Sequence, residues 1–201
     1  MKIGFLFALL FLSTNLLASG TGYSSYPLVL EKSLLSTELT GITSTGGGMG
    51  VQGRYTQKLN PSMVFDGGIG VSGGERNGRI FANMDYEIFP DYREQPRVGI
   101  KTGLENVEEF DSRINRLGIA PVVSKGFSFW GEEAYPFFSL PTKLNLNSDT
   151  DTYYTSFSAN FGITGNIPVQ GYRHLIGSLE TQIDINDSYT ALFMGITYPL
   201  N

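Results

Sequence analysis

Hydrophobic and polar residues alternate along most of the chain beyond residue 48, in stretches of about ten residues. Clusters of Gly, Asn, Asp and Pro separate these stretches. A period of two is typical of β-strands, whereas a helix would repeat at i, i+3, i+4 and i+7, and no sustained helical repeat occurs. The pattern therefore predicts nine strands, over residues 49–59, 63–73, 79–89, 97–105, 115–125, 134–146, 153–163, 175–185 and 190–200.

One stretch leaves room for interpretation, and another is predicted to be a turn. Residues 35–44 either form a tenth strand or join the next one through Gly46, Gly47 and Gly48. Residues 73–78 are rich in glycine and polar side chains and are typical of a turn. The chain length, at about ten residues per strand plus turns, allows eight to ten strands, since even numbers are usual in barrels.

An amphipathic strand needs one apolar and one polar environment, which a soluble sandwich or a membrane barrel can both supply. Three features favour the barrel. The strands match the length of a tilted membrane crossing, aromatic residues such as Tyr55, Phe89, Tyr153 and Tyr198 fall near strand ends, and the apolar faces carry almost no charge. We predict an all-β fold, an antiparallel up-and-down transmembrane β-barrel.

The polar faces of the predicted strands carry charges of both signs in near balance. Such groups would pair inside a narrow lumen, and at this barrel size a plugged lumen is favoured over a wide pore. The predicted lumenal polar network consists of Arg54, Asp66, Arg79, Asp85, Glu87, Arg97, Lys101, Glu105, Arg116, Lys143, Glu180 and Asp184.

The first twenty residues have the layout of a secretory signal peptide. Lys2 precedes an apolar run from Ile3 to Leu12, and small residues around Ala18 and Gly20 offer cleavage after either one. The run is too short to span a bilayer comfortably as a helix. We expect a signal peptide over 1–20, an N-terminal extension over 21–34 and a barrel domain over 35–201.

Composition excludes several classes of function. The 201 residues include no cysteine and one histidine, so disulfides, cysteine nucleophiles and His–His metal sites are excluded. The formal net charge of −5 argues against a nucleic-acid binder. No cofactor and no metal site is expected.

With its signal peptide, its alternating strands and its closing segment from Tyr189 to Tyr198, the chain resembles the small outer-membrane β-barrel proteins of Gram-negative bacteria. In that family the last strand ends in an aromatic residue, whereas this chain continues through Pro199, Leu200 and Asn201. The resemblance implies the cell outer membrane as location. It also implies contact with outer-membrane lipid and with the barrel-assembly machinery during insertion.

Candidate catalytic and binding motifs are sparse. His174 is the sole candidate for a histidine general base, but an offset of four residues would separate it from Ser178 by about 13 Å along a strand. The acidic run of Glu105, Glu108, Glu109 and Asp111 lacks a calcium-loop pattern and is interpreted as solvated loop charge.

We therefore expect an outer-membrane barrel with a structural, anchoring or surface-interaction role and no catalysis. The alternatives are a narrow pore for small polar solutes, a lipid-modifying enzyme that uses His174, and a soluble periplasmic β-barrel or β-sandwich.

Overall fold

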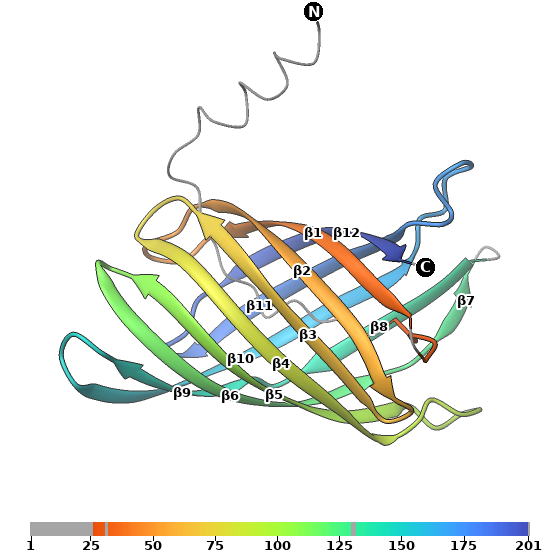
Figure 1. Cartoon of the computed structure of the whole chain (residues 1–201), viewed down its shortest axis with the longest axis horizontal. Helices are drawn as coiled ribbons and strands as arrows, with labels where there is room; N and C mark the ends of the chain where they lie inside the picture. The colour runs from red at the N-terminus through yellow and green to blue at the C-terminus, as the bar shows by residue number, and fades with distance from the viewer. Residues whose placement is uncertain (1–25, 31, 130–131, 201) are drawn as a thin grey trace, which may run out of the picture.

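The computed structural model describes residues 26–30, 32–129 and 132–200. The predicted signal peptide lies outside these residues. Within them the chain winds into a closed antiparallel barrel, in which strands adjacent in sequence are hydrogen-bonded and the last strand pairs with the first (Figure 1). The strands are β1 (Ser33–Ile42), β2 (Met49–Asn60), β3 (Met63–Ser72), β4 (Arg76–Phe89), β5 (Arg97–Glu109), β6 (Ser112–Ser124), β7 (Phe127–Phe129), β8 (Glu132–Ser139), β9 (Thr142–Asn147), β10 (Thr152–Asn166), β11 (Ile176–Asn186) and β12 (Ala191–Leu200).

The barrel wall has ten positions because β8 and β9 form one continuous strand. Both pair with β6 and with β10 in an unchanged register. The interruption falls at Pro141, beside Pro121 of β6, and proline cannot donate a ladder hydrogen bond. The tenth strand is β1, which is separate from β2, while β7 only extends the β8 hairpin beyond the wall. The predicted antiparallel up-and-down barrel is confirmed.

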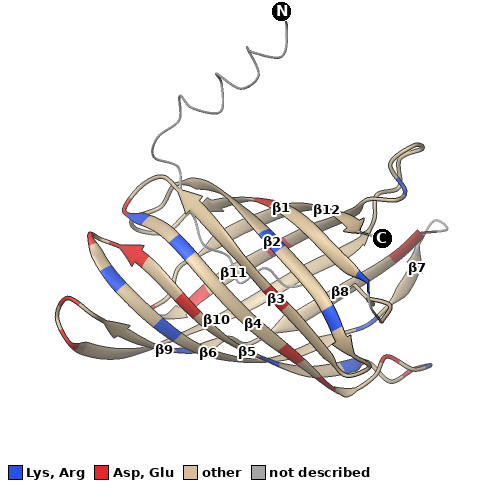
Figure 2. Ribbon diagram, in the orientation of Figure 1, with Lys and Arg blue, Asp and Glu red and all other residues tan. Residues whose placement is uncertain are grey.

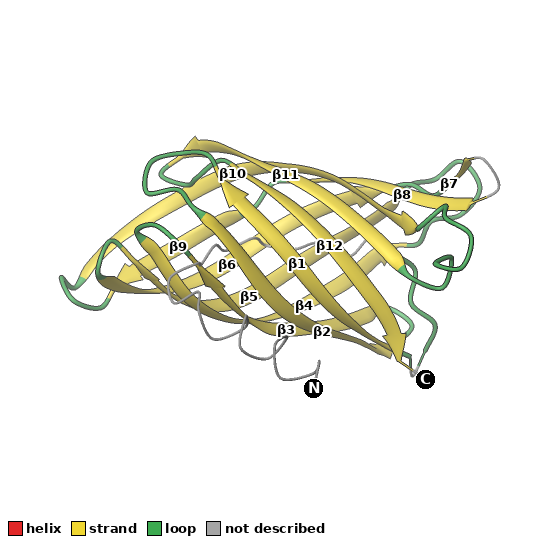
Figure 3. Cartoon of the chain, turned by 90° about the horizontal axis from the view of Figure 1, so that it is seen from above, coloured by secondary structure: helices red, strands yellow, loops and turns green. Residues whose placement is uncertain are grey.

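The strands are strongly tilted (Figure 3). Following hydrogen-bonded neighbours once around the wall from Asn166 leads back to Tyr154, twelve residues earlier on β10. A ten-strand barrel with that stagger has strands inclined by about 40° and a backbone radius of about 10 Å. A ten-residue strand then rises about 25 Å along the axis, the height of an outer-membrane apolar band.

The outer face of the barrel is apolar. Large hydrophobic side chains point outward from the strands and are exposed, which is the reverse of a soluble core. They include Leu39 on β1, Val51 on β2, Ile69 on β3, Ile80 on β4, Leu104 on β5, Leu117 on β6, Leu144 on β9, Phe161 on β10, Leu179 on β11 and Met194 on β12. This apolar outer belt around a polar interior is the arrangement of an outer-membrane-type β-barrel. The described residues contain no helix long and apolar enough to cross a bilayer.

The two ends of the barrel differ. One end, here called the turn end, is closed by the connections 43–48, 73–75, 110–111, 148–151 and 187–190. The other, the loop end, carries the first residue of β1, the last residue of β12, the connections 61–62, 90–96 and 167–175, and the β7–β8 hairpin (Figure 1).

Several strand boundaries extend further than the sequence pattern indicates, and two of these extensions lie side by side. Arg76 belongs to β4, although residues 73–78 resemble a turn, and β5 continues from Glu105 to Glu109. The two extensions pair with each other, Arg76 opposite Glu109, across an irregularity in the β4–β5 ladder. A long-range partner therefore converts turn-like sequence into strand.

Candidate functional site

Charged side chains of both signs line the inside of the barrel. Near the loop end, the half-buried Lys58 faces the lumen without an ion-pair partner among the described residues. Seven further cations and seven acids of the described residues point into the lumen, and all are buried or nearly so. We call this set the lumenal charge network. It comprises Arg54, Arg76, Arg79, Arg97, Lys101, Arg116 and Lys143 with Glu38, Asp66, Asp85, Glu87, Glu105, Glu109 and Glu180.

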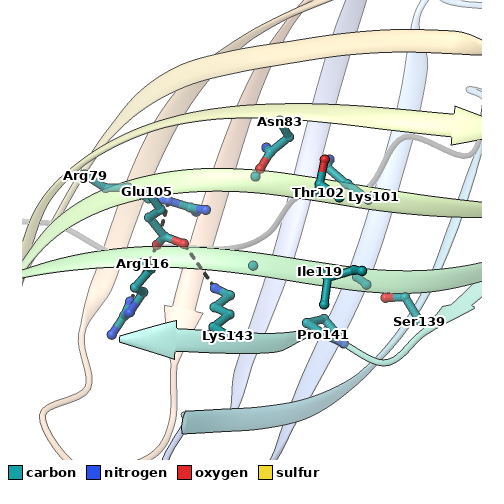
Figure 4. Close-up of a pocket in the computed structure, with 13 residues that line it drawn as sticks. Arg79, Asn83, Lys101, Thr102, Glu105, Arg116, Ile119, Ser139, Pro141 and Lys143 are labelled. Carbon is teal, nitrogen blue, oxygen red and sulfur yellow. Dashed lines mark hydrogen bonds and ion pairs between the residues drawn. The ribbon is translucent and has the colours of Figure 1, made fainter. Parts of the chain in front are cut away.

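Glu105 on β5 is the centre of the network. Arg79 Nε from β4 lies 3.1 Å from its carboxylate, Arg116 Nη1 from β6 lies 3.5 Å away, and Lys143 Nζ from β9 lies 3.1 Å away. Figure 4 shows these side chains converging beside a cavity of about 40 Å³. One carboxylate thus connects four strands of the wall.

Asp66 on β3 is a second centre. Lys101 Nζ lies 2.7 Å from one carboxylate oxygen, and the Asn83 amide donates to the other at 2.7 Å. Arg54 Nε lies 4.0 Å away, while Arg54 Nη2 pairs with Glu38 of β1 at 3.1 Å. This part of the network extends from β1 to β5.

The Phe81 ring contacts two like charges within the wall. The guanidinium carbons of Arg54 and Arg79 lie 5.3 and 4.4 Å from its ring centroid. Cation–π attraction of this kind contributes about 0.5–2 kcal/mol per contact. An aromatic residue facing the lumen is therefore part of the electrostatic arrangement.

At the turn end the network crosses the lumen. Arg76 Nη1 pairs with Glu109 at 2.9 Å, and Arg116 Nη2 pairs with the same carboxylate at 2.6 Å. The Arg76 guanidinium also lies 4.8 Å from the ring of Tyr189, in the turn between β11 and β12. Because β11 stands opposite β4 in the ten-strand ring, this contact joins facing sides of the barrel.

At the loop end a single guanidinium holds two acids. Arg97 Nη2 pairs with Asp85 at 2.9 Å and Arg97 Nε pairs with Glu87 at 2.9 Å, all three on β4 and β5. Hydrogen bonds between charged partners are stronger than those between neutral ones, and one arginine supplies two of them here.

Glycines on the inner face give the long side chains room. Lys143 reaches Glu105 across Gly118 of β6, where an added Cβ would touch the lysine Cγ at 3.4 Å. The Phe81 ring lies over Gly68 of β3, and a Cβ there would be 2.7 Å from its Cζ. These glycines allow contacts between strands that are not nearest neighbours.

Eleven of the twelve residues predicted for the lumenal polar network lie inside the barrel, and Asp184 does not. Asp184 is exposed, and its carboxylate accepts a hydrogen bond from the Ser188 amide at 3.0 Å. It lies beyond Gln182, the last β11 residue that pairs with β12, so alternation no longer determines its surroundings.

Sequence reasoning missed several members of the network. Glu38 lies on β1, for which the sequence pattern allows two interpretations, and its two-residue spacing from Ser36 and Thr40 is the signal that indicates an inward position. Arg76 belongs to a stretch that the sequence pattern predicts to be a turn. The interpretation of the acidic run as solvated loop charge is wrong for Glu105 and for Glu109, because both are buried among arginines of the network.

The other chemical candidates are dispersed. His174 is exposed in the connection 167–175, with its ring edge-on to Tyr198 at 6.1 Å. Glu180 is buried and accepts a hydrogen bond from Asn160 at 2.5 Å. No hydrogen bond joins His174, Ser178 and Glu180 within the described chain, and its residues form no cluster suited to a metal ion.

The connections at the two ends differ in charge (Figure 2). Exposed or half-exposed acids dominate the turn end, where Arg113 is the one exposed cation in the part of the chain that the structure describes. The loop end mixes Lys32, Arg93, Lys125 and Arg173 with acids. The turn-end acids are Glu75, Glu108, Asp111, Asp149, Asp151, Asp184 and Asp187.

At the loop end, Asp91 clamps the connection 90–96 onto Lys125. Its carboxylate binds the Lys125 ammonium and accepts the Gly126 amide at 2.6 Å. Burial by itself would raise the pKa of Asp91, but these two donors outweigh it and hold the pKa below its ordinary value of 3.8. The clamp is therefore ionised at neutral pH.

Comparison with known proteins adds little. No family model matches the chain, and no curated protein matches its sequence. Among solved structures, it is similar to Ail, the attachment invasion locus protein of Yersinia pestis, at 9% identity and a TM-score of 0.30, over 86% of this chain and 100% of Ail. A likeness this weak carries no argument, and the fold assignment rests on the strand pairing.

Proposed function

We propose that this protein is an outer-membrane barrel with a closed lumen, which serves as an anchor and presents its loops to surface partners, without catalysis or solute transport. The observation that carries the proposal is the pairing of the lumenal charges. Along the wall of the described barrel, the seven cations of the network form ion pairs with six of its acids, and the seventh acid, Glu180, accepts a hydrogen bond from Asn160. A selective path would instead need a ring of one sign.

Contacts across the lumen at both ends support closure. Arg76 meets Tyr189 at the turn end. At the loop end, Leu28 packs on the inner face beside Leu34 and Ile176. The ten-strand barrel is narrow enough for its own side chains to obstruct it.

The loop end is the better candidate for a surface partner. Its connections and the β7–β8 hairpin carry exposed hydrophobic side chains, among them Tyr92, Phe127, Val169 and Tyr172. Exposed apolar groups among polar ones are typical of protein contact sites. The connections at the turn end are acidic, and Phe110 is the exposed large hydrophobic residue among their described residues.

Location and closure are tested on the expressed full-length protein. Cell fractionation should recover it with the outer membrane, and an unboiled sample should migrate faster on a gel than a boiled one. Planar-bilayer recordings of the folded protein should show no steady conductance steps. Recovery in the soluble periplasm would refute the membrane location, and reproducible conductance steps would instead support the narrow pore.

Enzyme activity is tested separately through His174. His174→Ala should leave the lipid profile of the host unchanged if the barrel has no catalytic role. A lipid change that requires this histidine would overturn that part of the proposal.

A further inference from the structure

Residues 26–30 precede β1 and turn into the mouth of the barrel at the loop end. Leu28 is 8% exposed and packs against Leu34 of β1 and Ile176 of β11, with Val64 of β3 at the edge of the cluster. All three partners point inward. The chain therefore places an apolar side chain inside the lumen before it joins the wall.

The same segment reaches the other side of the mouth. The Tyr26 ring meets Tyr135 of β8 edge-on, with centroids 5.7 Å apart. Between β3 and β8 the ring contains three strands in one direction and five in the other. Tyr26 and Leu28 together thus cross the opening rather than follow its rim.

A cavity lies beneath this crossing. Its volume is about 180 Å³, and the segment contributes Tyr26, Pro27 and Leu28 to its wall. The barrel contributes Lys58, Arg97 and Ser124, among others. Lys58 lines this cavity without an ion-pair partner among the described residues. Asp85, Glu87 and Asp91 line the same cavity, so space and charged groups lie directly behind the segment.

The segment is attached to the barrel differently from the turn-end closure. At the turn end, the closing side chains are Arg76, which belongs to β4, and Tyr189, which lies in the short connection between β11 and β12. At the loop end, the backbone hydrogen bond to the wall that lies nearest to the segment is a long one of 3.5 Å from the Lys58 amide to the carbonyl of Lys32, beyond the end of residues 26–30. The docked residues are held by side-chain packing, which can be lost without breaking a strand.

From this geometry we infer that residues 26–30 form a displaceable latch, which closes the loop end of the lumen and on release exposes the cavity lined by Lys58 and Ser124. The inference rests on the proposed function only for the premise that the lumen is closed. Leu28 is its anchor, and Tyr26 sets its position across the mouth.

The test uses the absence of native cysteine. Ser124→Cys places one thiol in the latch cavity, where the serine is 4% exposed, and Ser72→Cys places one inside the turn end, where the serine is 0% exposed. Folded protein in detergent micelles is treated with N-ethylmaleimide, and the labelling rate is followed by mass. Each thiol is combined with Leu28→Asp or with the control Val29→Asp, whose parent side chain is 69% exposed.

Leu28→Asp should accelerate labelling at Ser124→Cys by about ten-fold or more. Burial of a leucine side chain stabilises the docked segment by more than the free energy that corresponds to a tenfold change in an equilibrium constant. Val29→Asp should leave that rate within about two-fold, since it adds the same charge without removing a buried group. Neither change should alter labelling at Ser72→Cys. Equal rates with and without Leu28→Asp would overturn the latch, as would equal acceleration at both thiols.

A second variant guards against misfolding. Deleting residues 26–30 should give the same acceleration at Ser124→Cys while the unboiled gel mobility of the barrel is preserved. A deletion that keeps this mobility but leaves labelling slow would refute the latch. Conductance of the unmodified protein would refute the closed lumen. The labelling rates would still show whether residues 26–30 cover the cavity.

Discussion

The two sides of the lumen wall differ in how they are held together. The side formed by β1 to β6 and β9 carries thirteen of the fourteen charges of the lumenal charge network, whereas β10 to β12 carry only Glu180 among the residues described. The inner face of β10 to β12 presents small hydroxyls, amides and apolar groups. It includes Ser156, Ser158, Asn160 and Thr164 on β10, Ile176 and Gln182 on β11, and Ala191, Phe193 and Thr197 on β12.

This difference shows how the charges are stabilised. Few charges face the cations and acids across the lumen. They therefore form ion pairs along their own side of the wall, with partners that lie one or two strands away. Long side chains and inner-face glycines make those lateral contacts possible. The charged side therefore acts as a brace between strands, and the uncharged side relies on ladder hydrogen bonds and close packing.

Glu105→Gln should be the most damaging single change to the charged side. It leaves Arg79, Arg116 and Lys143 with one carboxylate fewer, and removing one partner of a buried pair costs about 3–5 kcal/mol. Urea unfolding of the barrel in lipid vesicles measures the effect. The control is Glu108→Gln on the same strand, where the side chain is 43% exposed and lies 3.8 Å from Arg113. That change should cost under about 1 kcal/mol, and equal losses would show that burial in the network is irrelevant.

Gly118→Val should weaken the brace by blocking the path of Lys143. The added side chain occupies the space next to the lysine Cγ, and overpacking of this kind costs about 1–3 kcal/mol. Gly53→Val is the matched control, because a Cβ there has nothing within 4 Å. A Gly118→Val barrel as stable as the Gly53→Val barrel would mean that the crossing over β6 is unnecessary.

Ser158→Ala samples the uncharged side and should cost only about 1 kcal/mol. The hydroxyl donates to Asn160 at 3.3 Å, and a neutral hydrogen bond contributes about 0.5–1.5 kcal/mol. The same vesicle unfolding experiment applies. A loss as large as that of Glu105→Gln would remove the distinction between the two sides.

The smallest expected effect is local and depends on pH. Since the pKa of Asp91 is lower in the folded protein, the clamp on Lys125 contributes its full stability above the ordinary value of 3.8 and loses it as the pH falls through the lowered folded value. Hydrogen exchange at the Gly126 amide should therefore speed up only in strong acid, after correction for intrinsic rates. Asp91→Asn should remove that dependence. A transition near neutral pH would exclude Asp91 as its cause.

Much of the fold follows from local pattern. Alternation assigns Arg54, Lys101 and Glu105 to the inner face because a period of two is a property of each strand alone. Pairing partners are different, because they depend on register between distant segments. The meeting of Arg76 with Glu109, and of Arg76 with Tyr189, could not be read from residues that resemble a turn.

The latch illustrates the same limit. Leu28 and Tyr26 precede any alternating segment, and nothing in their own sequence indicates that they enter the lumen. Their positions depend on Ile176 and Tyr135, which are more than a hundred residues away along the chain. For Asp184 the prediction is wrong for the opposite reason. The alternation along the sequence continues through Asp184, whereas the pairing of β11 with β12 ends at Gln182.

The most direct test of the lateral brace is a double-mutant cycle between Lys143→Met and Glu105→Gln, measured by unfolding in lipid vesicles. The two groups lie 3.1 Å apart across β6. If they brace the wall, the two losses should fall short of additivity by about 1–3 kcal/mol. Losses that add to within about 0.3 kcal/mol would show that the pair is uncoupled and would contradict the account.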